Sequence, residues 1–166
     1  METFWSIVIA VMFILFFCAF IPSGKGDCTV CGTHGLTKDL QFYNFKEIAS
    51  AHQPLKGIGY YCTACAGKVE EAAKLVAVAK ANAPTQTWPA TYKGKVPVVP
   101  GSEQSRVHSD WQKEKESARE QLLVTSVYLF PEANAVKQIE FDKRTDSTGN
   151  YQYTVWRASG IPCKVQ

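Results

Sequence analysis

Two Cys-x-x-Cys pairs stand out because their spacing suits metal coordination. Cys28 and Cys31 form the first pair, and Cys62 and Cys65 form the second. This spacing lets one tight turn direct two sulfurs at a single point, and two such turns can surround one ion with a tetrahedron of thiolates. Zinc is the usual occupant, because it is borderline soft and has no electronic preference against a tetrahedron. We therefore predict a structural Zn²⁺ site with these four cysteines as ligands.

The redox state of these cysteines depends on the compartment that the protein occupies. In an oxidising compartment the four could form two disulfides, whereas a reducing compartment leaves thiolates for a metal. Residues 63–80 have the composition of a helix, which would place the second pair at a helix N-terminus, where the dipole favours thiolate over thiol. Four sulfurs close the site, so His34 and His52 are expected on the surface or behind the ligands rather than among them.

The segment between the pairs resembles a known zinc-binding fold. Gly32 follows the first pair, aromatic residues cluster at 42–45, and a Gly-Ile-Gly-Tyr-Tyr run at 57–61 leads into the second pair. A knuckle, a short hairpin and a second knuckle that opens a helix form the pattern of treble-clef zinc fingers, and the resemblance covers about residues 28–80. It implies a fold and a zinc ion but no activity, because treble clefs serve many functions.

An apolar run over residues 4–21 precedes the cysteines. A helix of about 20 apolar residues crosses the hydrocarbon core of a bilayer, so we predict a transmembrane anchor in residues 1–22, with membrane lipid as its partner. A cleaved signal peptide and a soluble core helix are the alternatives. Lys25 and Lys38 follow the run and no Lys or Arg precedes it, which predicts an outside N-terminus and a cytoplasmic body, as in a bacterial inner-membrane protein.

The rest of the chain divides by composition. Residues 23–82 hold the four-cysteine module, and residues 83–108 are rich in proline and glycine, which indicates a linker with at most a short edge strand at 92–99. Residues 109–166 are expected to form a further α+β unit. The predicted fold class is therefore α+β, with an N-terminal transmembrane helix, a small zinc-stabilised module and a C-terminal helix packed with antiparallel strands.

The C-terminal unit contains an expected helix and two expected strands. Ser109 and Gln112 have the spacing of a capping box, which predicts a helix from there onward. Residues 122–130 are ambiguous, because their composition prefers a strand while their position continues the helix. Alternating apolar residues predict strands at 136–143 and 151–158, with a turn between them.

Four segments of the C-terminal unit carry a resemblance to a known family, namely 111–120, the Ala-Asn-Ala-Val step at 133–136, 139–142 and 153–160. They resemble the latter half of the YbjQ family, small bacterial proteins described as heavy-metal-binding domains. The resemblance implies an α+β fold in which residues 122–128 are helical, and it implies self-association, because some members assemble into rings. A stress-sensor lipoprotein with a related fold implies envelope signalling as an alternative. The matched positions are scaffold positions, so no functional residue carries over.

Charge and motif content limit the classes of function. The net charge is +3 and basic residues are interspersed with acids, so no nucleic-acid partner is expected. No catalytic constellation is found, and four thiolates leave zinc no open position for water, so we predict a protein that is not an enzyme and has no catalytic residues. The predicted function is that of a single-pass membrane-anchored zinc protein that self-associates or binds an unidentified protein at the membrane surface. The alternative is an envelope stress or redox sensor whose cysteines form disulfides or release zinc.

Overall fold

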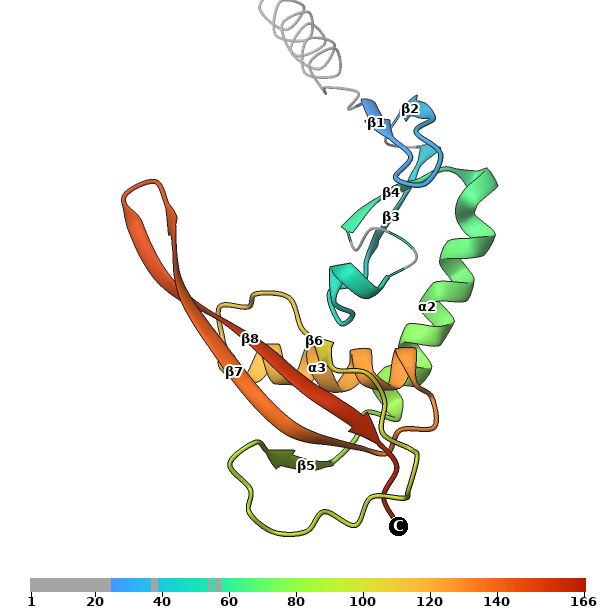
Figure 1. Ribbon diagram of the computed structural model, residues 1–166. Helices are drawn as coiled ribbons and strands as arrows, with labels where there is room; N and C mark the ends of the chain where they lie inside the picture. Colours follow the sequence, from blue (N-terminus) through green and yellow to red (C-terminus); the bar gives the residue numbers. More distant parts are fainter. Residues whose placement is uncertain (1–24, 37–38, 54, 56–57) are drawn as a thin grey trace, which may run out of the picture.

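The computed structural model describes residues 25–36, 39–53, 55 and 58–166 (Figure 1). These residues form an α+β structure with two α-helices and three small sheets. In chain order the elements are β1 (Lys25–Asp27), β2 (His34–Leu36), β3 (Gln41–Asn44), the 3-10 turn η2 (Ser50–His52), β4 (Ile58–Tyr61), the 3-10 turn η3 (Thr63–Cys65), α2 (Ala66–Ala81), β5 (Gln86–Pro89), β6 (Val107–His108), α3 (Lys115–Leu129), β7 (Ala135–Thr148) and β8 (Tyr151–Cys163). Two of the sheets are the hairpins β1–β2 and β3–β4, and the third has four strands.

No helix in this described part of the chain is long and apolar enough to cross a membrane. Helices α2 and α3 have 16 and 15 residues, whereas a span needs about 20 apolar residues. The apolar run at 4–21, on which the transmembrane prediction was based, lies outside the described residues. The predicted fold class with its transmembrane helix, and the predicted single-pass location with a cytoplasmic body, are therefore wrong for this structure, which is α+β over the residues it describes.

The C-terminal sheet has the strand order β5-β7-β8-β6. Its centre is an antiparallel hairpin in which β7 and β8 pair as far as Thr148 and Tyr151. Gly149 lies between them with φ +59°, in the left-handed region that a two-residue hairpin turn needs and that glycine adopts without strain. The strands predicted at 136–143 and 151–158 are confirmed, and both are longer than predicted: β7 continues to Thr148 at the turn, and β8 continues to Cys163 at the opposite end of the hairpin.

Helix α3 covers one face of this sheet (Figure 1). The core between helix and sheet consists of buried apolar side chains, namely Val107, Ala118, Leu122, Val136, Ile139 and Ala158. Residues 122–129 are helical, as the family resemblance implied, although their β-branched side chains favour a strand. Burial against the sheet outweighs this local preference, because tertiary packing supplies most of the stability of a helix in a protein.

The helix begins at Lys115, and the predicted capping box is wrong. Ser109 Oγ instead accepts a hydrogen bond from the N–H of Ala158 (2.9 Å). Gln112 pairs with Trp156 through two backbone hydrogen bonds of 2.8 and 2.7 Å. Both predicted capping residues therefore continue the edge of the sheet beyond β6, and this pairing keeps the chain extended until Lys115.

The proline-rich segment 83–108 contributes two edge strands to the sheet. Strand β5 pairs with β7 in parallel, and β6 pairs with β8 in antiparallel orientation. A small cluster joins the segment to the sheet and contains Trp88, Val96, Val98, Ala135, Cys163 and Val165. Strand β5 lies earlier in the chain than the edge strand expected at 92–99, where Val98 forms a single bridge with Val165.

Helix α2 connects the cysteine-bearing half of the molecule to the C-terminal half (Figure 1). The core along α2 and α3 consists of Phe45, Ile48, Leu55, Tyr61, Val69, Ala72, Val76, Ala79, Val124 and Val127. The N–H of Ala49 donates to Thr125 Oγ1 (3.1 Å). The N–H and hydroxyl of Ser50 both donate to Asp110 Oδ2 (2.9 Å each). The two halves therefore share a continuous core that is reinforced by hydrogen bonds.

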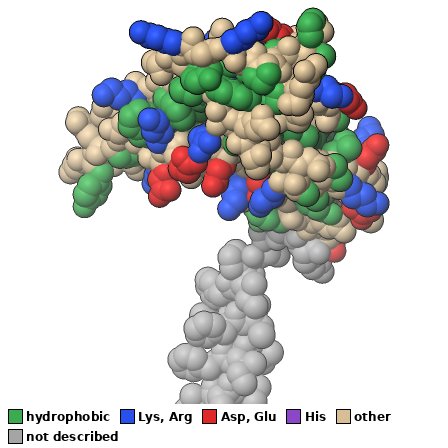
Figure 2. Space-filling model, turned by 90° about the horizontal axis from the view of Figure 1, so that it is seen from below, with side chains coloured by type: hydrophobic (Ala, Val, Ile, Leu, Met, Phe, Trp, Pro, Cys, Tyr) green, Lys and Arg blue, Asp and Glu red, His purple; other side chains and the backbone are tan. Residues whose placement is uncertain are grey.

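Charged side chains of both signs are interspersed on the surface. Figure 2 shows Lys and Arg among Asp and Glu on one face. Three ion pairs join neighbouring parts of the C-terminal sheet, namely Arg106–Glu140 (3.2 Å), Arg144–Asp146 (3.0 Å) and Arg157–Asp142 (2.9 Å). The guanidinium groups of Arg144 and Arg157 also lie 4.4 and 4.9 Å from the ring centroid of Trp111. These cation–π contacts attach the segment before α3 to the β7–β8 hairpin.

Thr125 provides a test of the contact between the two halves, because it is fully buried and accepts the Ala49 N–H. Thr125→Val keeps the shape of the side chain but leaves that buried N–H without its acceptor, which costs about 1–3 kcal/mol. We expect the free energy of unfolding to fall by this amount, as measured by urea unfolding followed by circular dichroism. Thr145→Val is the matched control, because Thr145 is exposed on β7, and it should change stability by less than about 0.5 kcal/mol. An equal loss in both variants would contradict this role for the hydrogen bond.

Gly160 provides a test of the packing of α3 on the sheet. A Cβ at this position would lie 2.6 Å from Val136 Cγ1 and 3.4 Å from Leu122 Cδ2. Gly160→Ala should therefore destabilise the fold by about 1–3 kcal/mol, the usual cost of overpacking. In the control Gly67→Ala the new Cβ meets open space on α2, and alanine favours the helix, so stability should stay equal or rise. The free energy of unfolding of both variants is measured by urea unfolding. An unchanged value in Gly160→Ala would contradict close packing of α3 on the sheet.

Candidate metal centre

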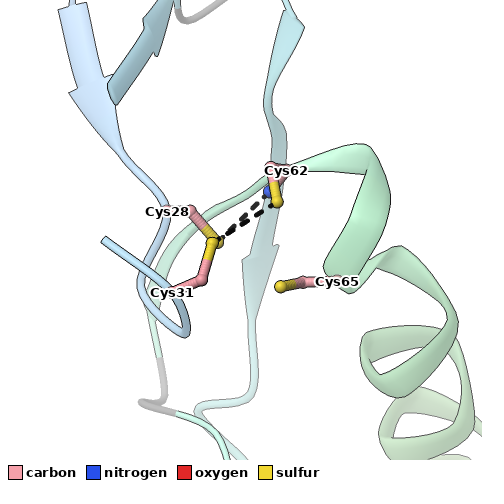
Figure 3. A group of neighbouring side chains, drawn as sticks. All are labelled: Cys28, Cys31, Cys62 and Cys65. Carbon is pink, nitrogen blue, oxygen red and sulfur yellow. Dashed lines mark hydrogen bonds between the residues drawn. The ribbon is translucent and has the colours of Figure 1, made fainter. Parts of the chain in front are cut away.

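The first cysteine pair lies in the tight turn between β1 and β2. The N–H of Cys28 donates to the Thr33 carbonyl (2.9 Å), and the N–H of Gly32 donates to the Cys28 carbonyl (2.8 Å). Gly32 adopts φ +71°, which glycine reaches without strain. The turn directs the side chains of Cys28 and Cys31 towards the second pair (Figure 3).

The second pair lies where β4 leads into α2. Cys62 directly follows the strand, and the 3-10 turn η3 brings Cys65 to the N-cap position of α2. The N–H of Cys65 donates to the Cys62 carbonyl (2.9 Å), which closes this turn. The helix predicted over 63–80 is confirmed as η3 followed by α2, and the second pair lies at its N-terminus as expected.

Hydrogen bonds hold the two turns together. The N–H and hydroxyl of Thr29 both donate to the Tyr60 carbonyl (2.8 and 3.0 Å). The N–H of Cys62 donates to the sulfur of Cys28 (3.4 Å). Gly59 permits this approach, because a Cβ there would lie 2.2 Å from Thr29 Oγ1. Cysteine spacing did not identify Thr29 or Gly59, although a Gly-x-Gly run before the second pair is typical of a close backbone approach.

The four sulfurs converge on one point. All four Sγ atoms lie within 4.8 Å of one another, and those of Cys31 and Cys62 are 3.7 Å apart. A tetrahedron of sulfurs around zinc has edges of about 3.8 Å, because the Zn–S bond is about 2.3 Å. A disulfide requires about 2.05 Å between sulfurs, and all four cysteines are free. The arrangement therefore fits one metal ion bound by four sulfurs and does not contain the two disulfides that the sequence left open.

Hydrogen bonds favour thiolate in the first pair. Burial raises the pKa of the Cys28 thiol, but three backbone N–H groups donate to its sulfur and lower its pKa to about 6. These donors belong to Val30, Cys31 and Cys62. The hydroxyl and N–H of Thr33 likewise lower the pKa of Cys31. Backbone and side-chain donors thus stabilise negative charge at this turn.

Cys65 has the opposite tendency. Its thiol donates to the sulfur of Cys62 and burial adds to this effect, so the pKa of Cys65 is raised to about 12. Without a cation the site holds ionised and protonated sulfurs side by side, because four adjacent thiolates repel one another. A divalent cation would remove this conflict, because it would hold all four sulfurs as thiolates.

The two histidines considered in the sequence analysis, and Cys163, lie outside this group of sulfurs. His34 is exposed on β2, and its Nδ1 contacts the carboxylate of Asp27 across the hairpin. His52 lies in η2. Cys163 is fully buried in the C-terminal sheet, where burial raises its pKa. The expectation that both histidines lie outside the site agrees with this geometry.

Comparison with known proteins identifies no relative, since no protein-family model, no curated protein and no solved structure matches this chain. The resemblances to treble-clef zinc fingers and to the YbjQ family are therefore not confirmed by these comparisons. The candidate metal centre is defined by the positions and the hydrogen bonds of its four sulfurs.

The hydrogen bonds to Cys28 predict an acidic thiol in the chain stripped of metal. The ultraviolet absorbance of thiolate should rise in a step with a midpoint of about 6, and the step should vanish in Cys28→Ser and persist in Cys163→Ala. The pKa of Cys28 in the folded chain lies below its unfolded value of 9.0. Ionisation of Cys28 therefore stabilises the fold fully at a pH above 9.0, and this contribution is lost as the pH falls through about 6. A first thiol midpoint at the unfolded value would contradict these hydrogen bonds.

Proposed function

We propose that this protein binds one Zn²⁺ through Cys28, Cys31, Cys62 and Cys65, and that the ion has a structural role. The observation that carries the proposal is the convergence of four sulfurs from two separate turns, all within 4.8 Å of one another. Four thiolates in a tetrahedron are a typical ligand set for structural zinc. A closed set of four protein ligands leaves no position for water or substrate, which supports a structural rather than a catalytic ion.

The small core of the first hairpin supports this structural role. Among residues 26–36, Cys28 alone is buried, and most of the other side chains are exposed. Apolar burial supplies little stability to a segment of this kind, and small modules commonly gain theirs from a metal. Bonds from zinc to sulfur would tie the hairpin to β4 and α2, whose Tyr61 and Val69 enter the main core.

We further propose that the protein is not an enzyme and that it binds a protein partner or a second copy of itself. Large apolar side chains are exposed on the cysteine-bearing half, namely Val30, Phe42, Tyr60, Leu75 and Val78. The β7–β8 hairpin also extends beyond the short strands β5 and β6, which leaves strand edges uncovered by them. Exposed apolar surface and free strand edges are both typical of interaction surfaces.

The order of the elements supports the resemblance to treble-clef fingers. A knuckle within one hairpin, a second hairpin and a knuckle that opens a helix follow one another over residues 25–81. The resemblance of the C-terminal unit to the YbjQ family supports self-association as the form that the interaction takes. We therefore propose a treble-clef-type zinc module joined to a YbjQ-like unit.

Metal analysis of the full chain purified under reducing conditions tests the zinc site. We expect one zinc per chain, and the four thiols of the site should react with a thiol reagent much more slowly before chelation than after it. Cys62→Ser should lose the ion, and amide hydrogen exchange should rise in β1 to β4 and in the first turn of α2, because one tie between the turns is gone. The β7–β8 hairpin should keep its protection, because it packs in a separate cluster with α3.

Cys163→Ala is the matched control, because it removes a buried thiol outside the site. It should retain one zinc per chain and leave hydrogen exchange in the cysteine-bearing half unchanged. A wild-type chain that holds no zinc, or a Cys62→Ser variant with unchanged exchange in β1 to β4, would rule out the structural role.

A further inference from the structure

The four sulfurs of the proposed zinc site differ in their exposure to solvent. Cys28 and Cys65 are buried, with 2% and 9% of their surface exposed. Cys62 is half-buried, whereas Cys31 lies in the β1–β2 turn and is exposed, as are its neighbours from 30 to 33. Solvent access is one of the two factors that control the oxidation of a cysteine, the other being thiolate character. Cys31 is therefore the residue of the four that a soluble oxidant approaches most freely.

The sulfur of Cys62 is the nearest accessible partner for Cys31. The two Sγ atoms lie 3.7 Å apart and belong to separate turns. Cys28 is the other candidate, but it is buried and its sulfur accepts the N–H of Cys62. A disulfide between Cys31 and Cys62 needs their sulfurs to approach to about 2.05 Å, a small movement for an exposed turn.

We propose that the zinc site is a redox switch, in which hydrogen peroxide oxidises Cys31 and a Cys31–Cys62 disulfide then forms and releases the ion. This inference rests on the proposed zinc site. The Cys31 thiolate attacks one peroxide oxygen, and the O–O bond breaks to give a sulfenic acid and hydroxide. The Cys62 thiolate then attacks the sulfenic sulfur, forms the S–S bond and expels a second hydroxide. The two sulfurs lose two electrons in total, and the peroxide gains them.

Disulfide formation removes two of the four ligands. Zinc is left with the buried sulfurs of Cys28 and Cys65, which cannot complete a tetrahedron, so the ion dissociates. The β1–β2 hairpin then loosens, because it has little core of its own. The packing of α2 on α3 remains, because their shared core contains none of the four cysteines. Reduction by a thiol and return of zinc restore the site.

The test uses the full zinc-loaded chain treated with hydrogen peroxide. Released zinc is followed with a chromogenic chelator, and disulfides are assigned by mass spectrometry after tryptic digestion. Cleavage after lysine separates the first pair, on peptide 26–38, from the second pair, on peptide 57–68. We expect one zinc released for each disulfide, with the peptides cross-linked through Cys31 and Cys62. Dithiothreitol and added zinc should reverse both changes.

Cys31→His tests the order of the reaction, because three cysteines and one histidine also bind zinc, but the variant lacks the thiol of the exposed residue. Peroxide should release zinc from this variant about tenfold more slowly, whereas Cys163→Ala should match the wild type. If Cys31→His holds no zinc, the proposal is tested by whether the first disulfide in the wild type joins Cys31 to Cys62. First disulfides within either Cys-x-x-Cys pair, or equal release rates, would overturn the switch and leave structural zinc standing. A wild-type chain without zinc would overturn the proposed function, and the switch with it.

Discussion

The hairpin of β1 and β2 buries the side chain of Cys28 and little else, and the arrangement of the cysteine-bearing half depends on this constraint. Apolar burial cannot hold such a hairpin in place, so convergent sulfurs and the hydrogen bonds between Thr29 and Tyr60 hold it. Gly59 permits the close approach that those bonds need. A metal bound at this point would stabilise the fold of this half, as we propose, and Cys31 is the most exposed of its four candidate ligands.

Helix α2 connects the cysteine cluster to the core of the C-terminal half. Its N-terminus is at Cys65, and its later turns belong to a core shared with Val124 of α3. Gln121 is buried beside this core, where its Nε2 donates to the Lys46 carbonyl (2.9 Å) and its Oε1 accepts the Asp110 N–H (2.7 Å). A buried amide with both ends paired makes the contact specific as well as apolar. One end of α2 therefore lies at the four sulfurs, and its other end is fixed in this shared core.

The sequence by itself determined the features that depend on local spacing. A Cys-x-x-Cys turn brings its own two sulfurs together, and the chemistry of four thiolates then favours a single ion, so the four members of the site were predictable. Alternating apolar residues likewise predicted β7 and β8. The apolar run at 4–21 predicted a membrane span, but that run lies outside the described residues, and no helix among those residues is long and apolar enough to cross a membrane.

Only the tertiary structure decided the features that depend on partners distant in the chain. Helix α3 starts at Lys115 because the residues before it pair with β8, and segment 83–108 supplies strands because β7 and β8 offer it their edges. Cys28 is buried and Cys31 exposed although both belong to one motif, because the first of them packs against β4. The spacing of the cysteines predicts which sulfurs can converge on one point, whereas packing between distant segments determines which cysteines are exposed to solvent.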